Sequence, residues 1–332
     1  MQFSLIICTY MRPEPLLKLL QSVQKQTLYP DEVLIIDGSK NDETAVVLQA
    51  NSFHNLKYFK VLDIDRGLTK QRNYGVEHVG KEMEVVCFLD DDTELKPDYF
   101  EELIITFKND SLVTGVGGVA INENLWEIEE PNKKYNSKKI YQFKGYVYKE
   151  GQRNVVRNYL GLQSDVGPGK MPSFSHGKTC GFPLNGKTYE VDLLIGMAMA
   201  FRKVVFDNIK FSSYFQGYGL YEDADFSIRA LAFGNNIVNT KVQLYHYHEP
   251  SGRPNQYNYG RMVVRNGWYV WRVKNPNPKL KDQLKWHAIT ILLTLIRFSN
   301  TFTSDSKKEA LTESIGRTIG WWSLWISKPN KK

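Results

Sequence analysis

The sequence predicts an α/β protein with a mostly parallel sheet covered by helices on both faces, followed by a C-terminal helical region. Over the first 120 residues, short apolar runs alternate with segments of helical periodicity, and this order requires right-handed crossovers between parallel strands. From about residue 251 the chain turns basic and aromatic, with helical periodicity throughout. We therefore expect one domain over residues 1–250 and a C-terminal helical region over 251–332.

Each element of the first 120 residues has its own local signal. Expected strands are apolar runs, and in the first expected helix Leu16, Leu17, Leu19, Leu20 and Val23 recur at helical spacing. Prolines stand at the start of two helices, where a missing N–H is tolerated. The expected order is strand 2–9, helix 13–26, strand 32–37, helix 42–50, strand 57–62, helix 69–79, strand 85–89 and helix 97–108.

The remainder of the chain is less regular. Residues 123–190 are rich in Lys, Tyr, Gly and Asn without sustained periodicity, so we expect an insertion of loops and short strands within the first domain. Regular structure is expected to resume at 191–201, with a helix at 223–233 and a strand at 237–246. Helices are expected at 258–273, 280–298 and 307–326.

Composition excludes some classes of function but does not identify the function. The 332 residues are 42% hydrophobic and 24% charged, as in an ordinary globular protein. A net charge of +7 suggests an anionic partner, but the lysines are dispersed and no nucleic-acid recognition motif appears. Three cysteines without a CxxC pair indicate neither a disulfide framework nor a zinc site. With no signal-peptide pattern and no apolar run of about 20 residues, we expect a cytoplasmic protein, with the inner face of the membrane left open.

Polar residues directly follow three of the expected strands. Thr9, Asp37 and Asp90 each end an apolar run. Since parallel strands present their carboxyl ends at one edge of the sheet, where ligands bind, all three should project from that edge.

The run VVCFLDDD, residues 85–92, is the strongest feature. Three consecutive carboxylates after a buried strand repel each other unless a cation or hydrogen-bond donors neutralise them, and a hard divalent cation is one solution. In extended backbone Asp91 should point away from Asp90 and Asp92. The alternative is a solvated acidic turn before the next helix.

A second acidic segment, GYGLYEDADFSIRA, spans residues 217–230. Glu222 and Asp223 open the expected helix, and Asp225 can pair with Arg229 four residues on. One carboxylate could serve as a general base, and the alternative is an acidic helix start with a salt bridge.

Two further segments carry chemistry. In LYHYHEP, His246 and His248 alternate at a strand end, and either imidazole could complete a metal shell, although a structural pair is the alternative. In DRGLTKQRNYG, Arg66, Lys70 and Arg72 lie near a helix start that could hold phosphate, although basic residues on a helix are usually only solvated.

Taken in order, these segments resemble glycosyltransferase family 2, whose Rossmann-like nucleotide-binding fold is called GT-A. The matching segments are IICTYMRPEPLLKLLQSVQKQT, VLIIDGSKNDET, GLTKQRNYGV, VVCFLDDDTELKPDYF, IGMAMAFRKVVFDNIKF, GYGLYEDADFSIRA and LYHYHEPSGR, spread over about residues 3 to 253. The resemblance implies a GT-A fold with the insertion unmatched.

The resemblance also implies which residues bind the donor. Positions that match its nucleotide and diphosphate contacts are Thr9, Tyr10, Arg12, Asp37, Arg72, Asp90 and Asp91. Among them, Asp37 matches the aspartate that reads the base, usually uracil, and Arg72 matches the residue that approaches the diphosphate.

The resemblance assigns metal binding and catalysis to later positions. Asp92 matches the metal ligand of the DxD motif, and relatives with a histidine ligand place it at the strand end where His246 and His248 stand. Asp223 matches the catalytic base and is preceded by Glu222. The segment 196–202 resembles the lining of the donor-sugar and acceptor pocket.

The implied function is an inverting, Mg²⁺- or Mn²⁺-dependent transfer of a sugar from a nucleoside diphosphate, UDP in most relatives, to a hydroxyl of a glycan or lipid-linked glycan. A non-catalytic nucleotide-sugar-binding module is the alternative from another class. A nucleotidyltransferase is less favoured, because CTYMRPEP lacks glycine.

The C-terminal helices leave one question open. Their tryptophans and flanking basic residues resemble a surface for peripheral membrane contact, which would suit a lipid-linked acceptor. Ordinary packing is the alternative. The tryptophans are Trp286, Trp321, Trp322 and Trp325.

Overall fold

The computed structural model describes residues 1–178, 180–249 and 254–329. The chain divides into two compact units, Met1–Asn124 with Leu184–Arg253, and Leu125–Pro183 with Pro254–Lys332. Most of the expected insertion therefore groups with the C-terminal helices, whereas the sequence placed all of 123–190 in the first domain. The expected boundary at 250/251 and the end of the LYHYHEPSGR segment lie outside the described residues.

The first unit begins with four parallel strands, in the order β3-β2-β1-β4. The strands lie where the sequence predicted them, to within two residues at either end, and β1, β2 and β4 are buried over nearly their whole length. The strands are β1 (Phe3–Thr9), β2 (Glu32–Asp37), β3 (Leu56–Lys60) and β4 (Val85–Asp90), and the helices between them are α1 (Pro13–Val23), α2 (Glu43–Gln49) and α3 (Leu68–Glu77), with the short turn η1 (Asp63–Asp65) before α3.

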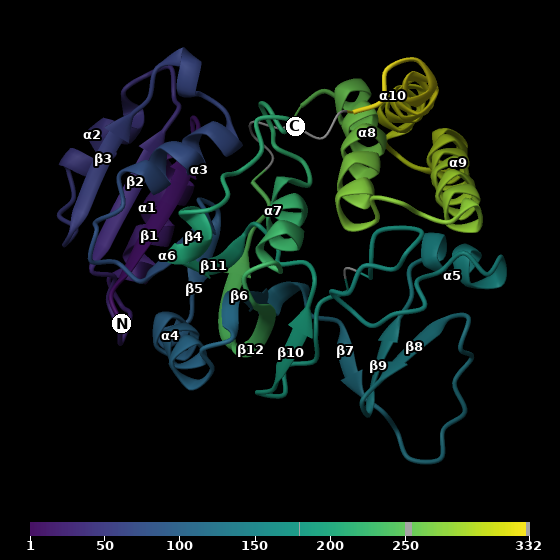
Figure 1. The fold of residues 1–332 in the computed structure, drawn as a ribbon, viewed down its shortest axis with the longest axis horizontal. Coiled ribbons are helices and arrows are strands. Elements are labelled where there is room, and N and C mark those ends of the chain that lie inside the picture. The colour runs from purple at the N-terminus through teal and green to yellow at the C-terminus, as the bar shows by residue number, and fades with distance from the viewer. Residues whose placement is uncertain (179, 250–253, 330–332) are drawn as a thin grey trace. The chain divides into compact units, whose positions relative to one another are not determined.

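The sheet continues beyond β4 as β11-β6-β12-β10, and β5 also pairs with β12, giving nine strands in its described part (Figure 1). Only β5, β10 and β11 oppose the common direction, so the described sheet is mostly parallel, as predicted. The added elements are β5 (Thr93–Leu95), α4 (Tyr99–Asn109), β6 (Val113–Ala120), η2 (Ile121–Glu123), β10 (Thr188–Val191), β11 (Ala198–Arg202), α6 (Lys203–Phe206), α7 (Glu222–Ala230) and β12 (Asn235–His246).

The sequence did not predict strand β6, whose eight residues VTGVGGVA are all buried. Glycine weakens a strand, so three of them obscured the signal. Close packing explains them: a Cβ on Gly115 would collide with the Asn236 side chain and the Phe201 ring, and one on Gly118 would crowd the carbonyl oxygen of Val242.

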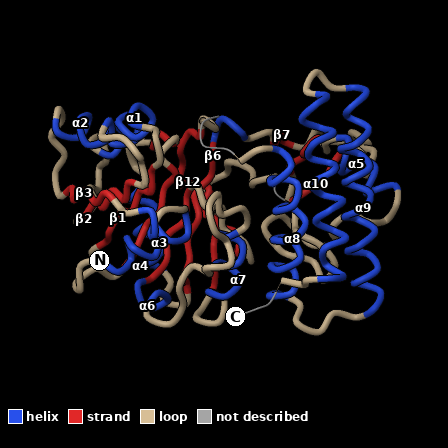
Figure 2. The backbone as a smooth tube through the Cα atoms, turned by 90° about the horizontal axis from the view of Figure 1, so that it is seen from above, coloured by secondary structure: helices blue, strands red, loops and turns tan. Residues whose placement is uncertain are grey.

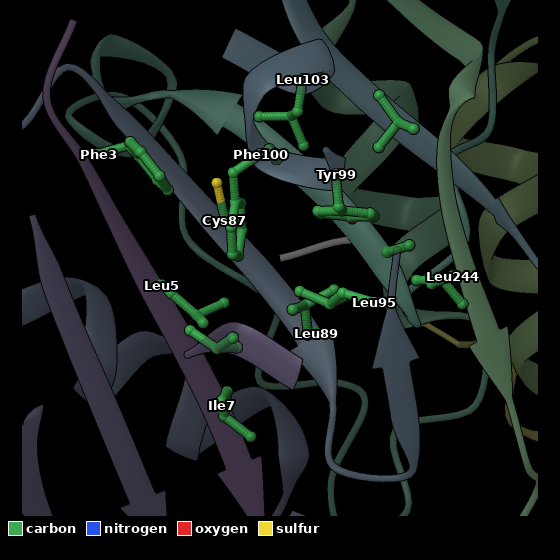
Figure 3. Close-up of a cluster of buried hydrophobic side chains, with 14 of the residues drawn as sticks. Phe3, Leu5, Ile7, Cys87, Leu89, Leu95, Tyr99, Phe100, Leu103 and Leu244 are labelled. Carbon is green, nitrogen blue, oxygen red and sulfur yellow. The ribbon is translucent and has the colours of Figure 1, made fainter. Parts of the chain in front are cut away.

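A hydrophobic core fixes the sheet against α1 and α4 (Figure 3). Side chains of β1 and β4, including Leu5 and Cys87, meet Phe100 and Leu103 of α4, and all four are at most 1% exposed. Because these side chains are fully buried and closely packed, the strands have little freedom to shift, and the carboxyl edge of the sheet is held in place.

The second unit contains a three-stranded antiparallel sheet, ordered β7-β9-β8, and a group of helices. The expected C-terminal helices are confirmed, with ends that differ by a few residues. The elements are β7 (Trp126–Ile128), β8 (Ile140–Phe143), β9 (Tyr146–Lys149), α5 (Gln152–Tyr159), α8 (Gln256–Lys274), α9 (Leu280–Thr303) and α10 (Lys307–Ile326).

Helices α8 and α10 approach each other closely, side by side in both views (Figures 1 and 2). A Cβ on Gly260 would collide with the carbonyl oxygen of Glu313, and one on Gly316 would collide with that of Tyr257. Glycine at these positions therefore permits backbone-to-backbone packing. Among the described residues, none of the helices is both long and apolar enough to cross a bilayer.

Candidate active site

The carboxyl edge of the parallel strands carries the residues predicted there. Register pairs Thr9 with Asp37 across β1 and β2, and Cys8 with Asp90 across β1 and β4. The three polar strand ends therefore lie at one edge, which confirms the expected arrangement.

The three consecutive aspartates contact different groups, and Asp91 and Asp92 lie in a turn after β4 rather than in extended backbone. Asp91 accepts hydrogen bonds from Thr9 Oγ1 at 2.7 Å and Arg12 Nη1 at 3.0 Å. Burial raises the pKa of Asp91 to about 7, although both partners oppose that shift. Asp91 is thus held by the loop after β1, whereas Asp90 contacts Arg72 and Asp92 contacts His246.

Asp90, Asp92 and His246 form a cluster that could hold a metal ion. One ligand atom from each lies within 4.8 Å of the others. Asp92 Oδ1 is 3.4 Å from His246 Nε2, and its Oδ2 accepts the backbone N–H of Glu249 at 2.7 Å. Two carboxylates and an imidazole, with positions left for phosphate oxygens, suit Mg²⁺ or Mn²⁺.

Glu123, at the end of η2, contacts both histidines. Its Oε1 lies 2.8 Å from His246 Nδ1 and 2.9 Å from His248 Nε2. The Nε2 of His246 faces Asp92, an orientation that suits a metal ligand. His248 is 56% exposed at its side chain, and its ring centroid lies 4.0 Å from that of His246.

Arg72 is buried and satisfied by protein groups rather than projecting into open space. Its guanidinium pairs with Glu222, approaches Asp90 Oδ1 at 3.4 Å and donates to the carbonyl of Gly196 at 3.1 Å. It also lies over the ring of Phe88, 5.7 Å from the centroid. In this state Arg72 ties the end of β4 to the start of α7.

Gly196 links the acidic start of α7 to Arg72. The Gly196 N–H donates to Asp223 Oδ2 at 2.8 Å, and a Cβ at Gly196 would crowd both Arg72 and Asp223. Glu222 is 3% exposed, and its Oε2 has no hydrogen-bond partner among the described residues. Burial raises the pKa of Glu222 to about 8 against the opposing effect of Arg72. The expected ion pair of Asp225 with Arg229 is also present, at 2.6 Å.

Asp37 is fully buried, and both of its oxygens are engaged. Oδ1 accepts the Ser39 N–H at 2.7 Å, and Oδ2 accepts the Tyr58 hydroxyl at 2.8 Å. A nucleotide base could contact the Asp37 carboxylate only if Tyr58 or the loop at Ser39 moved. Tyr10 is 37% exposed in the loop after β1, next to Met11 with φ +57°.

Three residues that organise this edge were not predicted. Glu123 lies 31 residues after Asp92, and Tyr58 lies on β3, so neither belongs to a recognisable motif. Gln71 donates to the carbonyls of Thr9 at 3.1 Å and Ile36 at 2.8 Å, which ties β1 to β2. Its position beside Arg72 was the one available signal.

The sheet and the acidic cluster at its carboxyl edge agree with the GT-A fold that the sequence predicted. Residues 4–159, just under half of the chain, match the model of glycosyl transferase family 2.

Curated relatives are glycosyltransferases as well. The chain is 27% identical over 158 residues to the O-antigen chain rhamnosyltransferase RfbN of Salmonella typhimurium, covering 47% of this chain and 49% of that protein. It is 30% identical over 134 residues to glucosyl-dolichyl phosphate glucuronosyltransferase of Haloferax volcanii, covering 40% and 41%. The matches thus span half of each relative or less.

A solved structure supports the fold over the whole chain. The mannosyltransferase PcManGT from Pyrobaculum calidifontis, in complex with GDP-Man and Mn²⁺, superposes with a TM-score of 0.52 at 13% identity. The match covers 99% of this chain and 76% of that one. At this identity the likeness concerns the fold alone.

Proposed function

We propose that this protein is an inverting glycosyltransferase that moves a sugar from a nucleoside diphosphate, UDP, to a hydroxyl of a glycan or lipid-linked glycan during polysaccharide or glycoconjugate biosynthesis. The observation that carries the proposal is the convergence of Asp90, Asp92 and His246 at the sheet edge, linked through Arg72 and Gly196 to Asp223.

Asp92, Asp90 and the Nε2 of His246 would hold Mg²⁺ or Mn²⁺. When bound, the cation supplies positive charge that stabilises the departing diphosphate. His246 rather than His248 is the proposed ligand, because its Nε2 faces Asp92 while Glu123 holds its Nδ1.

Asp223 is the proposed general base. The Gly196 N–H fixes one carboxylate oxygen, and the Ala224 N–H contacts the other at 2.8 Å. The carboxylate takes the proton of the acceptor hydroxyl as that oxygen bonds to the anomeric carbon, while the bond from this carbon to the diphosphate oxygen breaks. Attack opposite the leaving group inverts the configuration. Glu222 keeps Arg72 beside this base.

Donor contacts are proposed for the loops at the same edge. Thr9 and Arg12 fix Asp91, so these three residues would shape the diphosphate pocket as a unit. The exposed ring of Tyr10 could stack on the base, whereas Asp37 would contact it only after displacement of Tyr58. Arg72 would exchange its contact with Asp90 for a phosphate oxygen.

The proposed place of action is the cytoplasmic face of a membrane. The name of the Haloferax relative includes a dolichyl phosphate, which favours a lipid-linked acceptor here. Peripheral contact through the C-terminal helices would bring the protein to such an acceptor.

Release of nucleoside diphosphate tests the proposal. A panel of UDP-, GDP- and dTDP-sugars is offered with Mn²⁺, with Mg²⁺ or with a chelator, and ligand-induced stabilisation is measured in parallel. We expect one donor to stabilise the protein and to be turned over only with a divalent ion. Stabilisation without release, even with a glycan acceptor library, would instead indicate a binding module.

A further inference from the structure

Helices α9 and α10 each carry an exposed apolar face. The spacings along α9 are seven, four, three and four residues, and those along α10 are four, four, three and four, so each set lies on one side of its helix. The exposed residues are Leu284, Ile291, Leu295, Phe298 and Phe302 on α9, and Leu311, Ile315, Ile319, Trp322 and Ile326 on α10, with Trp325 beside them.

The opposite face of each helix packs against α8. On α9, the buried Trp286 contacts the ring of Trp268 at 4.8 Å between centroids. On α10, a Cβ at Gly320 would lie 3.2 Å from the backbone of Arg261. Both exposed apolar faces therefore turn away from α8.

The two helices also contact each other along their length, and both views show them as neighbours (Figures 1 and 2). Arg297 on α9 pairs with Glu313 on α10 at 2.7 Å, and Trp321 Nε1 lies 3.0 Å from His287 Nδ1. These links run in opposite directions along the two helices, which places the helices antiparallel. The two apolar faces thus adjoin as one surface, which we call the α9–α10 face.

Charge is absent from this face and concentrated at its ends. Between 284 and 303 on α9, and between 311 and 326 on α10, none of the positions described as exposed is charged. Exposed lysines stand outside these limits, at Lys281 before the α9 stretch and at Lys328 after α10. Near that same end, Trp322 is 58% and Trp325 61% exposed.

The unit that carries this face is strongly basic. Its two segments contain 24 basic and 9 acidic residues, a net charge of +15, although the whole chain carries +7. A partner that suits both the apolar face and this charge must combine an apolar interior with an anionic surface.

We propose that the α9–α10 face docks on the surface of a bilayer that contains anionic lipid. Its apolar side chains enter the boundary between headgroups and acyl chains, its tryptophans lie at headgroup depth, and its lysines meet lipid phosphates. The helices lie along the surface rather than across it. A second copy of the chain is the less fitting occupant, because association of two such units brings two charges of +15 together.

This inference deepens the proposed function, since docking would bring the protein to a lipid-linked acceptor. Its test is separate, because vesicle binding requires neither donor nor metal. Failure of the protein to bind vesicles, with intact nucleotide-sugar turnover, would refute docking alone. Vesicle binding without turnover would refute the catalytic proposal alone.

The test uses flotation of the full chain with vesicles of phosphatidylcholine, with or without about a third phosphatidylglycerol. We expect flotation with the anionic vesicles, and weakening as salt is raised, because screening shortens the reach of the lysines. In the variant Leu295→Gln/Ile319→Gln/Trp322→Gln, binding should fall at least about tenfold, since three apolar insertions are lost.

A matched control removes apolar surface elsewhere. Val46, Leu62 and Leu112 of the first unit are 62%, 75% and 67% exposed, and the variant Val46→Gln/Leu62→Gln/Leu112→Gln should float like the original protein. Unfolding temperature and far-ultraviolet circular dichroism show that both variants are folded.

Three results would overturn the docking proposal. The first is failure of the unmodified protein to float with anionic vesicles at low salt, and the second is equal flotation of the α9–α10 variant. The third is a dimer in sedimentation velocity that the α9–α10 variant converts to a monomer, since a second copy would then occupy the face.

Discussion

The two units of this protein use charge in opposite ways. The first holds 19 basic and 27 acidic residues, a net charge of −8, whereas the second carries +15. In the first unit the decisive acids are buried and paired at a sheet edge, as Asp91 is with Arg12 and Glu222 with Arg72. In the second, lysines stand exposed around an apolar face. The overall +7 therefore describes neither unit.

That difference changes how the net charge is interpreted. The sequence suggested that +7 reflected an anionic partner of the whole chain. The site proposed to bind a nucleotide lies in the acidic unit, where the proposed metal ion would offset the carboxylates beside a diphosphate. The positive excess lies in the other unit and suits another partner.

Removing a metal-site carboxylate should give the largest effect, confined to the first unit. With Asp92→Asn, we expect turnover to fall about a thousandfold, because the leaving diphosphate loses its stabilising charge. Calorimetric titration with Mn²⁺ should show weakened binding, and flotation with anionic vesicles should be unchanged. Normal Mn²⁺ affinity in this variant would remove Asp92 from the metal site.

Crowding the α8–α10 contact should affect the second unit instead. In Gly316→Ala, the new methyl group collides with the carbonyl oxygen of Tyr257. We expect a loss of about 1–3 kcal/mol in the free energy of unfolding, measured by urea denaturation. Flotation should weaken, while turnover with a soluble acceptor persists.

Gly151→Ala provides the control for that substitution. Gly151 also lies in the second unit, but a Cβ there meets no atom within 4 Å. Its free energy of unfolding should change by no more than about 0.5 kcal/mol, because the loss of glycine at the N-cap of α5 opposes the smaller chain entropy of the unfolded variant. An equal loss in both variants would mean that the close helix contact is not the cause.

Glu123→Gln sharpens the choice between the histidines. Because an amide holds the Nδ1–H of His246 less strongly than a carboxylate, we expect about tenfold weaker Mn²⁺ binding. Glu94→Gln is the matched control, since Glu94 contacts the Tyr247 hydroxyl and neither histidine. His248→Gln should leave Mn²⁺ affinity near normal; a loss as large as that of His246→Gln would assign His248 to the metal.

A pH dependence of stability is also predicted for the second unit. Burial, reinforced by Arg157, lowers the pKa of His176 from 6.5 to about 4. As pH falls from 6.5, the unfolded chain takes up this proton first. Stability should therefore be complete above about pH 6.5 and decline toward pH 4, by at most about 1.4 kcal/mol per unit.

Urea denaturation at several pH values compares the protein with His176→Gln. The variant should lose less stability between pH 6.5 and 4. Parallel curves for the two proteins would show that His176 does not cause the acid sensitivity.

Much of the fold could be predicted because its signals are local. An apolar run such as Val85–Leu89 followed by aspartates specifies both a buried strand and where that strand ends. Strand β6 was not predicted, because glycine at positions 115 and 118 is required by close contacts with β11 and β12, and these strands are distant in sequence. Local propensity cannot register such a requirement.

The residues of the candidate site likewise divide into those that local sequence indicates and those that only strand pairing brings to the site. Asp90, Asp92 and Asp223 stand beside strand ends or helix starts, where sequence alone indicates chemistry. Glu123 becomes significant only because β6 pairs with β12 and carries η2 to His246. Likewise, the contact of Tyr58 with Asp37 depends on the pairing of β2 with β3.

Asp223→Asn tests the central claim most directly, when nucleoside diphosphate release and donor binding are measured on one preparation with Mn²⁺. We predict that release falls by at least about a hundredfold, because the acceptor proton has no base to receive it. Donor binding and Mn²⁺ affinity should remain. Release at the normal rate would contradict the assignment of Asp223 as base, and with it the proposed mechanism.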